Sequence, residues 1–298
     1  MIDIIIIGAG PAGLSAGIYA ASRGKNALIL EKDQVGGIIG KVSTVTHYIG
    51  IERKETGISF AKRMKEQALQ VGVEILHREV TAVKLTGDRK LVTTDQGVYE
   101  AARIILANGS TPRKLHIPGE DELAGRGIGM NAARDSASYR GKNVYVVGGA
   151  DGAVKEALYL SHFAKRVTIL HFENQLGCIE EFRKMAEAAG NIRICTGVRL
   201  HAVYGREQVE RLEIAHVSDG SIETVEDPGC GVFIYAGLIP NTQLYTELSL
   251  EGGYIPVNEK METAIPGVYA AGDIRVKQVR QVATAVADGT IAAINAAM

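Results

Sequence analysis

The 298-residue sequence has few of the residues that mark several classes of protein. It contains no tryptophan and three cysteines, Cys178, Cys195 and Cys230, of which no two form a CxxC pair. An odd, widely spaced set of cysteines does not predict a disulfide framework and is typical of proteins from the reducing cytosol. We therefore expect isolated thiols, either buried or at the surface.

The sequence also lacks a strong charge of either sign and a long apolar run. Its formal net charge is −1, which argues against nucleic acid or an anionic membrane as the main partner. No apolar stretch approaches the roughly 18 residues of a membrane span. The amino-terminal residues MIDIIII run directly into a glycine turn and predict a buried strand, not a signal peptide. The sequence thus predicts a cytoplasmic protein, and no metal site is predicted.

What the sequence does contain is an internal repeat. Residues 4–30, IIIIGAGPAGLSAGIYAASRGKNALIL, align without a gap to residues 144–170, VYVVGGADGAVKEALYLSHFAKRVTIL, at an offset of 140. Each copy predicts a strand, a tight turn, a helix and a second strand, which is a βαβ unit. We predict an α/β fold with two Rossmann-like, three-layer (ββα) nucleotide-binding domains, the second inserted into the first.

The glycines of the first copy predict a dinucleotide site. Gly8, Gly10 and Gly13 form GxGxxG directly after the strand. The first glycine permits the turn, the second lets the backbone approach a pyrophosphate, and the third lets the helix pack on the strand. The amino terminus of the helix attracts phosphate. Glu31 ends the second strand, where a carboxylate accepts hydrogen bonds from ribose hydroxyls.

The second copy has lost part of this pattern. Gly148 keeps the turn, but Ala150 places a methyl group where a pyrophosphate would approach the backbone. His171 stands in register with Glu31, 23 residues after the first glycine of its copy. The sequence therefore predicts a retained fold with lost or weakened nucleotide binding.

The residues after His171 bear on the choice of nucleotide. Phe172 and Glu173 follow it, and the next arginine is Arg183, so no cation is adjacent to pair with the 2′-phosphate of NADPH. Glu173 would repel that phosphate, but it can accept hydrogen bonds from ribose hydroxyls. The sequence argues against NADPH and leaves NADH open.

Further motifs point to one family. Residues 106–113, LANGSTPR, and residues 237–242, GLIPNT, resemble two segments of two-domain flavoproteins. Residues 263–273, TAIPGVYAAGD, resemble TxxPGVYAAGD, and residues 280–285, RQVATA, resemble RQxxTA. Together with GAGPAG and the glycines at 36–37, these motifs cover nearly the whole chain. The sequence resembles the low-molecular-weight thioredoxin reductases, which are pyridine nucleotide-disulfide oxidoreductases.

The resemblance implies that FAD is bound by a discontinuous domain, residues 1–113 with 232–298. A domain like those that bind NAD(P), residues 114–231, is inserted between these parts, and a homodimer through the FAD domains is expected. In the family the aspartate matching Asp273 contacts the flavin ribityl chain, and a helix starts beneath the flavin pyrimidine. The cofactor-binding residues expected on this basis are Gly8, Gly10, Pro11, Ala12, Gly13, Glu31, Lys32, Gly36, Gly37, His47, Val80, Ala107, Asn108, Gly109, Gly272, Asp273, Arg280, Gln281 and Val282.

Residues 36–50, GGIIGKVSTVTHYIG, match the family's flavin-facing loop in length but not in content. Ile38 replaces a glutamine and His47 an asparagine, whereas Tyr48 keeps an aromatic ring. By register His47 and Tyr48 are expected near the isoalloxazine, which makes them candidate catalytic residues. Two interpretations of His47 stay open. Either it has a functional role, in which it tunes the flavin or shuttles a proton, or it only forms a hydrogen bond with the flavin ring or with solvent.

The family's redox motif, SYCATCDG, matches residues 129–136, which are GMNAARDS. Asn131 and Arg134 occupy the two cysteine positions, and neither side chain can carry two electrons. The sequence therefore argues against thioredoxin reductase activity, and we expect Asp135, which is retained, to have a structural role.

Three hypotheses remain open. The first is an FAD-dependent oxidoreductase that exchanges electrons with ferredoxin, flavodoxin or a small quinone-like acceptor. The second is a flavin-binding sensor, scaffold or degenerate paralogue without turnover. The third is a weak NADH-specific reductase that uses Glu173 on the ribose.

Overall fold

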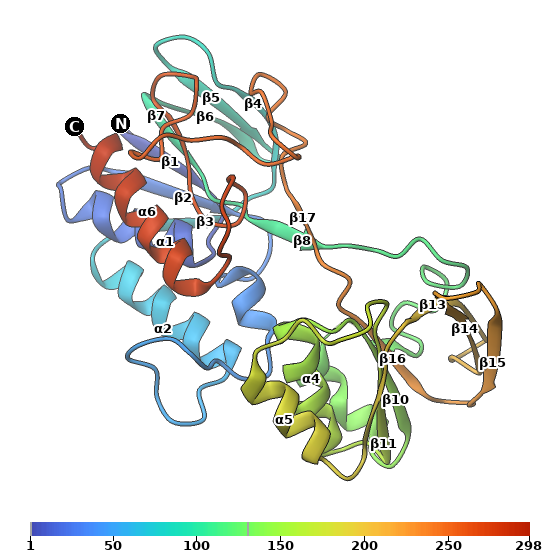
Figure 1. The fold of residues 1–298 in the computed structure, drawn as a ribbon. Coiled ribbons are helices and arrows are strands. Elements are labelled where there is room, and N and C mark those ends of the chain that lie inside the picture. Colours follow the sequence, from blue (N-terminus) through green and yellow to red (C-terminus); the bar gives the residue numbers. More distant parts are fainter. Residues whose placement is uncertain (1, 130) are drawn as a thin grey trace. The chain divides into compact units, whose positions relative to one another are not determined.

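The structure, a computed structural model, describes residues 2–129 and 131–298 (Figure 1). Met1 of the expected first strand and Met130 of the segment GMNAARDS lie outside the described residues. The chain divides into two compact units: Met1–Thr111 with Ile239–Met298, and Pro112–Leu238. We call these the first and the second unit. Both boundaries fall within short strands that pair with each other, β8 (Ser110–Pro112) and β17 (Leu238–Pro240).

The first unit is built on a five-stranded parallel sheet in the order β18-β7-β1-β2-β3. Three α-helices, a short 3-10 helix and a smaller antiparallel sheet accompany it. The elements are β1 (Ile4–Ile7), α1 (Pro11–Ala21), β2 (Ala27–Glu31), η1 (Gly37–Lys41), α2 (Gly57–Gln70), β3 (Glu74–His77), β4 (Val80–Lys84), β5 (Lys90–Thr94), β6 (Gly97–Ala101), β7 (Arg103–Leu106), β18 (Val268–Ala270) and α6 (Val282–Ala296).

The alternation of side chains along β1 shows the layers of this unit. Ile4 and Ile6 pack in a core with residues of α1 and α6, whereas Ile5 and Ile7 pack in a second core with residues of β5 and β6. Because both faces of the strand are covered, its sequence is a continuous apolar run. Helix α6 is fixed to α1 partly by the Ser15 hydroxyl, which donates a hydrogen bond to the Val286 carbonyl at 2.8 Å.

The second unit has a parallel sheet in the order β12-β11-β10-β16-β9 and an antiparallel sheet β13-β14-β15. Its elements are β9 (Ile128–Gly129), α3 (Ala132–Asp135), η2 (Ser136–Tyr139), β10 (Asn143–Val147), α4 (Asp151–Ser161), β11 (Arg166–Leu170), α5 (Glu180–Ala188), β12 (Ile192–Cys195), β13 (Val198–Tyr204), β14 (Arg211–His216), β15 (Ile222–Glu226) and β16 (Gly231–Ile234).

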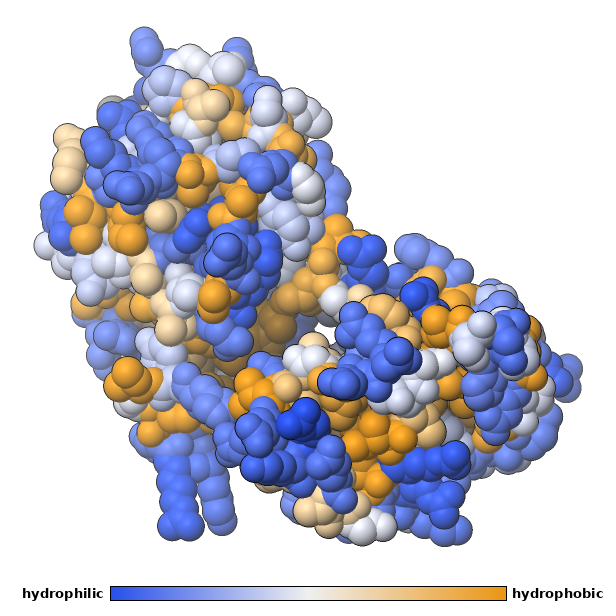
Figure 2. Space-filling view, viewed as in Figure 1, coloured by the Kyte–Doolittle hydropathy of each residue, from blue (hydrophilic) through white to orange (hydrophobic). Residues whose placement is uncertain are grey.

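The two βαβ units repeat each other in register. Ile4 of β1 faces Ala27 of β2, and Val144 of β10 faces Val167 of β11, which preserves the offset of 140 residues. The expected fold class, two Rossmann-like domains with a helical layer and a second β layer, is confirmed. No helix among the described residues is both long and apolar enough to cross a membrane. Apolar side chains are scattered among hydrophilic ones on the face in Figure 2, as is normal for a protein surface.

The division of the structure differs from the expected boundary at residue 232. The family resemblance implied that residues 232–298 belong to the FAD domain, and the Asp227-Pro228-Gly229 turn lies near that joint. Strand β16 instead pairs with β10, with Val232 opposite Tyr145, so residues up to Leu238 belong to the second unit. The physical reason is burial: Val232 and Phe233 are almost fully inaccessible to solvent and complete the second parallel sheet.

Candidate functional site

The glycines of the first turn do not all serve the same purpose. A Cβ at Gly8, where φ is +103°, would lie 2.6 Å from the Ala107 carbonyl oxygen, and a Cβ at Gly13 would lie 1.9 Å from the Gly8 carbonyl oxygen. The fold itself therefore requires glycine at these two positions. Gly10 has φ −75° and ψ −176°, which suit any residue, and a Cβ there would meet none of the described atoms within 4 Å.

The second turn shows that a side chain fits at the position of Gly10. Its counterpart Ala150 has φ −83° and ψ 173°, almost the same backbone conformation, and carries a methyl group. The fold therefore does not need a glycine at position 10, and the start of α1 is free of other described atoms on the side where a Cβ would lie. A pyrophosphate on the helix amino terminus fits this space.

Other loops at the carboxyl ends of the strands converge on this turn. The Ala9 amide donates a hydrogen bond of 2.7 Å to the Glu31 carboxylate, and the Gly36 amide donates one of 2.8 Å to the Ala9 carbonyl. A Cβ at Gly37 would lie 3.3 Å from the Gly10 Cα. The structure thus brings together the first turn, the end of β2 and the start of η1, as the sequence predicted.

Lys32 and Val80 lie at the end of β2. The Arg78 amide donates a hydrogen bond to the Glu31 carbonyl at 2.9 Å, and β4 begins two residues later at Val80. The Lys32 ammonium lies 3.6 Å from the Glu79 carboxylate in an exposed ion pair. Exposed pairs of this kind contribute little to stability, so the Lys32 side chain can turn toward a ligand at low cost.

Asn108 is committed to the protein itself. Its side-chain amide donates to the Asn241 carbonyl at 3.0 Å and accepts from the Tyr245 hydroxyl at 2.6 Å. Burial raises the pKa of Tyr245, which keeps this hydroxyl protonated. Sequence reasoning missed Tyr245, although the adjoining GLIPNT motif was a signal for it. Ala107 and Gly109 flank Asn108 and place their backbone at the end of β7.

Asp273 has the environment of a ligand-binding acid. Its Oδ1 is buried and has no hydrogen-bond partner among the described residues. Burial raises the pKa of the Asp273 carboxyl, and the positive charges of Lys277 and Arg280 offset only part of this effect. A buried acceptor without a partner costs about 1–3 kcal/mol. A hydroxyl of a bound cofactor would satisfy it.

The substitution Asp273→Asn is expected to stabilise the protein without cofactor and to weaken FAD binding. Because the folded-state pKa is raised, the ionised carboxyl costs stability, and this cost is present at about pH 7 and vanishes below the ordinary aspartate pKa of 3.8. Thermal unfolding of the apo variant should occur at a higher temperature than for the apo wild type at about pH 7, with the difference shrinking near about pH 4. An apo variant less stable than wild type would contradict this assignment.

The start of α6 is built by three expected site residues. Gln281 precedes the helix and donates its amide hydrogen to the Thr284 hydroxyl at 3.2 Å, and Val282 is the first helical residue. The Arg280 guanidinium stacks on the Tyr254 ring at 4.2 Å from its centre. A 15-residue helix begins here, so its amino terminus carries partial positive charge.

Sequence reasoning missed a buried charge cluster behind this turn. Asp288 of α6 accepts hydrogen bonds from the Gly272 amide at 3.1 Å, from Arg275 Nε at 2.8 Å and Arg275 Nη2 at 2.7 Å, and from Lys277 Nζ at 2.7 Å. The signal was a charged residue on the apolar side of an alanine-rich helix. Gly272 also packs on Ala12 of α1, since a Cβ would lie 2.9 Å from the Ala12 Cβ.

The candidate catalytic residues lie on the segment before α2. His47 is exposed, has φ +53°, and its Nδ1 lies 3.0 Å from the Thr46 hydroxyl. Tyr48 is half-buried, and its ring meets the Phe60 ring edge-on at 5.4 Å between centres. These contacts lie within residues 46–60 and do not by themselves connect either side chain to the glycine turn.

In the second unit a protein side chain covers the glycine turn. His171 is 5% exposed, and its ring stands over Gly149, where a Cβ would lie 2.5 Å from the ring. His171 Nε2 lies 3.2 Å from the Glu173 carboxylate, and the buried Nδ1 has no partner among the described residues. The Arg199 guanidinium stacks on Phe172 at 4.8 Å. The corresponding Glu31 in the first unit instead bonds the backbone beside an open turn.

The segment at the family's dithiol position is a short capped helix. The Asn131 side chain accepts a hydrogen bond from the Arg134 amide at 3.0 Å, and the Asn131 amide donates one to the Asp135 carboxylate at 3.0 Å. Arg134 Nε donates to Asp135 at 2.6 Å. Asn131 and Asp135 thus hold α3 together, which agrees with the structural role expected for Asp135.

The three cysteines are thiols in the structure. Burial raises the pKa of Cys230 to about 12 and also raises that of Cys178. Neither of these two thiols is activated toward the thiolate form that attacks disulfides.

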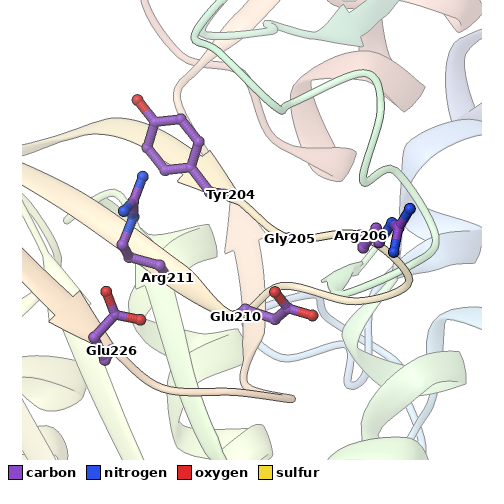
Figure 3. A pocket seen from close by; sticks show the side chains of 6 residues that line it. All are labelled: Tyr204, Gly205, Arg206, Glu210, Arg211 and Glu226. Carbon is purple, nitrogen blue, oxygen red and sulfur yellow. The ribbon is translucent and has the colours of Figure 1, made fainter.

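One pocket lies elsewhere in the second unit. It has a volume of about 400 Å³, and Figure 3 shows Tyr204 and Arg211 side by side at its wall, with the guanidinium 4.3 Å from the ring centre. Its polar lining mixes both signs of charge, with Arg206 and Arg211 set against two glutamates. None of the expected site residues lines it, and this mixture indicates no particular ligand.

Comparison with known proteins identifies what the whole chain resembles. A family model described as pyridine nucleotide-disulphide oxidoreductase matches residues 2–289. A thioredoxin reductase of Peptoclostridium acidaminophilum is 37% identical over 300 residues, covering 99% of this chain and 95% of that protein. The crystal structure of Lactococcus lactis thioredoxin reductase matches with a TM-score of 0.95 at 34% identity, covering 99% and 98%. A ferredoxin-flavin thioredoxin reductase structure from Clostridium acetobutylicum matches with a TM-score of 0.54 at 31% identity, covering 99% and 96%.

Proposed function

Because the chain belongs to the pyridine nucleotide-disulphide oxidoreductase family, we propose that it is an FAD-dependent oxidoreductase that exchanges electrons without a dithiol relay. The observation that carries the proposal is Gly10, a glycine that the fold does not require and that leaves open space at the start of α1. The buried, unpartnered oxygen of Asp273 among the described residues is a second feature that fits a bound flavin dinucleotide.

Each part of the first unit has a role toward the cofactor under this proposal. The amino terminus of α1 binds the pyrophosphate, and Glu31 accepts from ribose hydroxyls. Asp273 accepts from a hydroxyl of the ribityl chain, and the amino terminus of α6 favours negative charge on the nearby ring. When bound, FAD supplies the two-electron chemistry. His47 and Tyr48 are proposed to lie beside the flavin ring, where His47 is able to hold or release a proton.

The absence of a dithiol relay rests on the sequence. The thioredoxin reductases named above are similar to this chain, but here Asn131 and Arg134 stand at the positions of the family's cysteine pair. None of the three cysteines belongs to a CxxC pair. We therefore do not transfer thioredoxin reduction to this chain.

We propose that the second unit has lost the ability to bind NADPH and binds NADH weakly at most. The ring of His171 lies against Gly149, on the turn where a dinucleotide would approach the backbone. Glu173 is exposed and presents a negative charge where NADPH carries its 2′-phosphate. Binding of either nucleotide would require the His171 ring to move.

Anaerobic titration with NADH, NADPH and reduced ferredoxin tests these proposals by bleaching of the flavin band. NADPH is expected to reduce the flavin up to about fivefold more slowly than NADH, because repulsion between the exposed Glu173 carboxylate and a 2′-phosphate is worth up to about 1 kcal/mol in water. The double variant Phe172→Arg/Glu173→Arg should reduce the difference between the flavin reduction rates with NADH and NADPH. The control Glu207→Arg, at an exposed site in the same unit, should leave this difference unchanged. Equal rates with both nucleotides in the wild type would refute the proposed discrimination.

The electron partner is proposed to be ferredoxin, flavodoxin or a small quinone-like molecule. The ferredoxin-flavin thioredoxin reductase named above is similar in structure to this chain, which supports ferredoxin as the first candidate to examine. We also propose a cytoplasmic homodimer that forms through the first unit. If no donor reduces bound FAD, the alternative of a flavin-binding protein without turnover would replace the enzymatic proposal.

A further inference from the structure

The buried cluster around Asp288 contains more positive charge than its structural role requires. Arg275 alone contacts both carboxylate oxygens through Nε and Nη2, which is the paired geometry that satisfies a carboxylate. Lys277 adds a second cation, with its side chain only 5% exposed and its ammonium 2.7 Å from the same carboxylate. Burying a second ammonium costs several kcal/mol, and a carboxylate that Arg275 already pairs offsets this cost only in part.

The neighbourhood of the Gly272–Asp273 turn has a positive excess. Arg275, Lys277 and Arg280 carry three positive charges, against the two carboxylates Asp273 and Asp288. The positive charges of Lys277 and Arg280 act on Asp273, and the amino terminus of α6 adds partial positive charge. An anion that binds at this turn would be stabilised.

We propose that Lys277, held by Asp288 against the Gly272–Asp273 turn, is a positioning residue whose buried charge stabilises the reduced, anionic form of the bound flavin. The inference rests on the proposed binding of FAD to this turn. Its basis is the surplus cation itself: the clamp between Asp288 and Arg275 is complete without it, and the reduced ring is the form of the cofactor that carries negative charge.

The direction of electron flow follows from this charge. A flavin whose reduced form is stabilised takes electrons readily and gives them up less readily to carriers of low potential. Ferredoxins of the plant type have low reduction potentials. Under this proposal two reduced ferredoxin molecules, each a donor of one electron, together reduce the flavin by two electrons. The acceptor is a compound of higher potential such as a quinone, which takes both electrons and two protons to become the quinol.

Equilibration of the bound flavin with a reference dye of known potential tests the role of Lys277. Lys277→Met keeps the apolar stem and removes the charge, and it should shift the equilibrium about tenfold toward oxidised flavin, as expected for one partly screened buried charge. Lys277→Arg should restore the wild-type equilibrium. Lys260→Met, which removes an exposed lysine of the same unit, should leave it unchanged.

Two outcomes separate this inference from the proposal beneath it. If the wild type binds no FAD, the proposed function fails. If FAD binds and Lys277→Met has the wild-type equilibrium with the dye, the inference is overturned, even when the variant holds FAD less tightly. A purely structural lysine would change the affinity for FAD or the thermal stability of the protein, but not the reduction potential of the bound flavin. Lys277→Gln, which keeps a hydrogen-bond donor for Asp288, serves the same comparison should the methionine variant not fold.

Discussion

Replacing Gly10 with valine is expected to give a correctly folded protein that retains little FAD. The backbone at this position has φ −75° and ψ −176°, and a Cβ would meet none of the described atoms within 4 Å, so the fold accepts a side chain. The branched side chain would fill the space in which a pyrophosphate contacts the start of α1. Losing one good phosphate site costs at least about 1.4 kcal/mol, which raises the FAD dissociation constant about tenfold or more. Flavin absorbance per protein should therefore fall after gel filtration in buffer without FAD.

The repeat provides a matched control for this variant. Ala150→Val makes the same change at the equivalent position of the second turn and should leave the FAD content at the wild-type level. Circular dichroism of both variants should match the wild type. Retention of full FAD content by Gly10→Val would show that the first turn is not the pyrophosphate site.

Asp288→Ala is expected to produce a large loss of stability in the first unit. The side chain is 5% exposed and bonds Arg275, Lys277 and the Gly272 amide, so its removal leaves two cations and a buried amide without their acceptor. Breaking a buried charge network in this way costs about 3–5 kcal/mol. Urea denaturation of the apo protein should show the loss as a lower midpoint, with Asp88→Ala, an exposed aspartate, as the control within about 0.5 kcal/mol of wild type.

The loss of stability caused by Asp288→Ala should become smaller in strong acid. Burial acts to raise the pKa of Asp288, but hydrogen bonds and charge from Arg275 and Lys277 outweigh it and hold the pKa below the ordinary aspartate value of 3.8. The ionised carboxylate therefore contributes stability that is present above about pH 4 and is lost as the pH falls through the lowered pKa. The gap between Asp288→Ala and wild type should be constant around neutral pH and should close in strong acid. A gap that widens in acid would contradict the assigned ion pairs.

The fold was predictable because local pattern and global arrangement agree. The GxGxxG turn, the run Ile4–Ile7 and the 140-residue repeat each specify a βαβ unit, and the motifs near Asn108 and Asp273 identify the family, which the comparisons confirm. The expected boundary after residue 231 differs from the observed division at Leu238, because a Pro-Gly turn precedes a strand of the inserted sheet as readily as it precedes a linker.

Features that depend on spatial neighbours could not be predicted from the sequence. Asp288 contacts Arg275 and Lys277 because α6 presents one face to the loop that precedes it. The sequence does not indicate which cation reaches the carboxylate. His171 was identified as a departure from the repeat, but its position over Gly149 depends on the rotamer of one buried ring. The sequence predicted close approach of a pyrophosphate at Gly10, but only the structure shows that the backbone conformation there also accepts a side chain, as at Ala150.

The central claim is that the flavin is the only two-electron centre of this protein. Anaerobic reductive titration with dithionite counts the electrons directly. The account predicts an endpoint at about two electron equivalents per bound FAD, because neither Asn131 nor Arg134 forms a reducible couple. An endpoint at about four equivalents, with free thiols appearing on reduction, would reveal a redox-active disulfide and contradict the account.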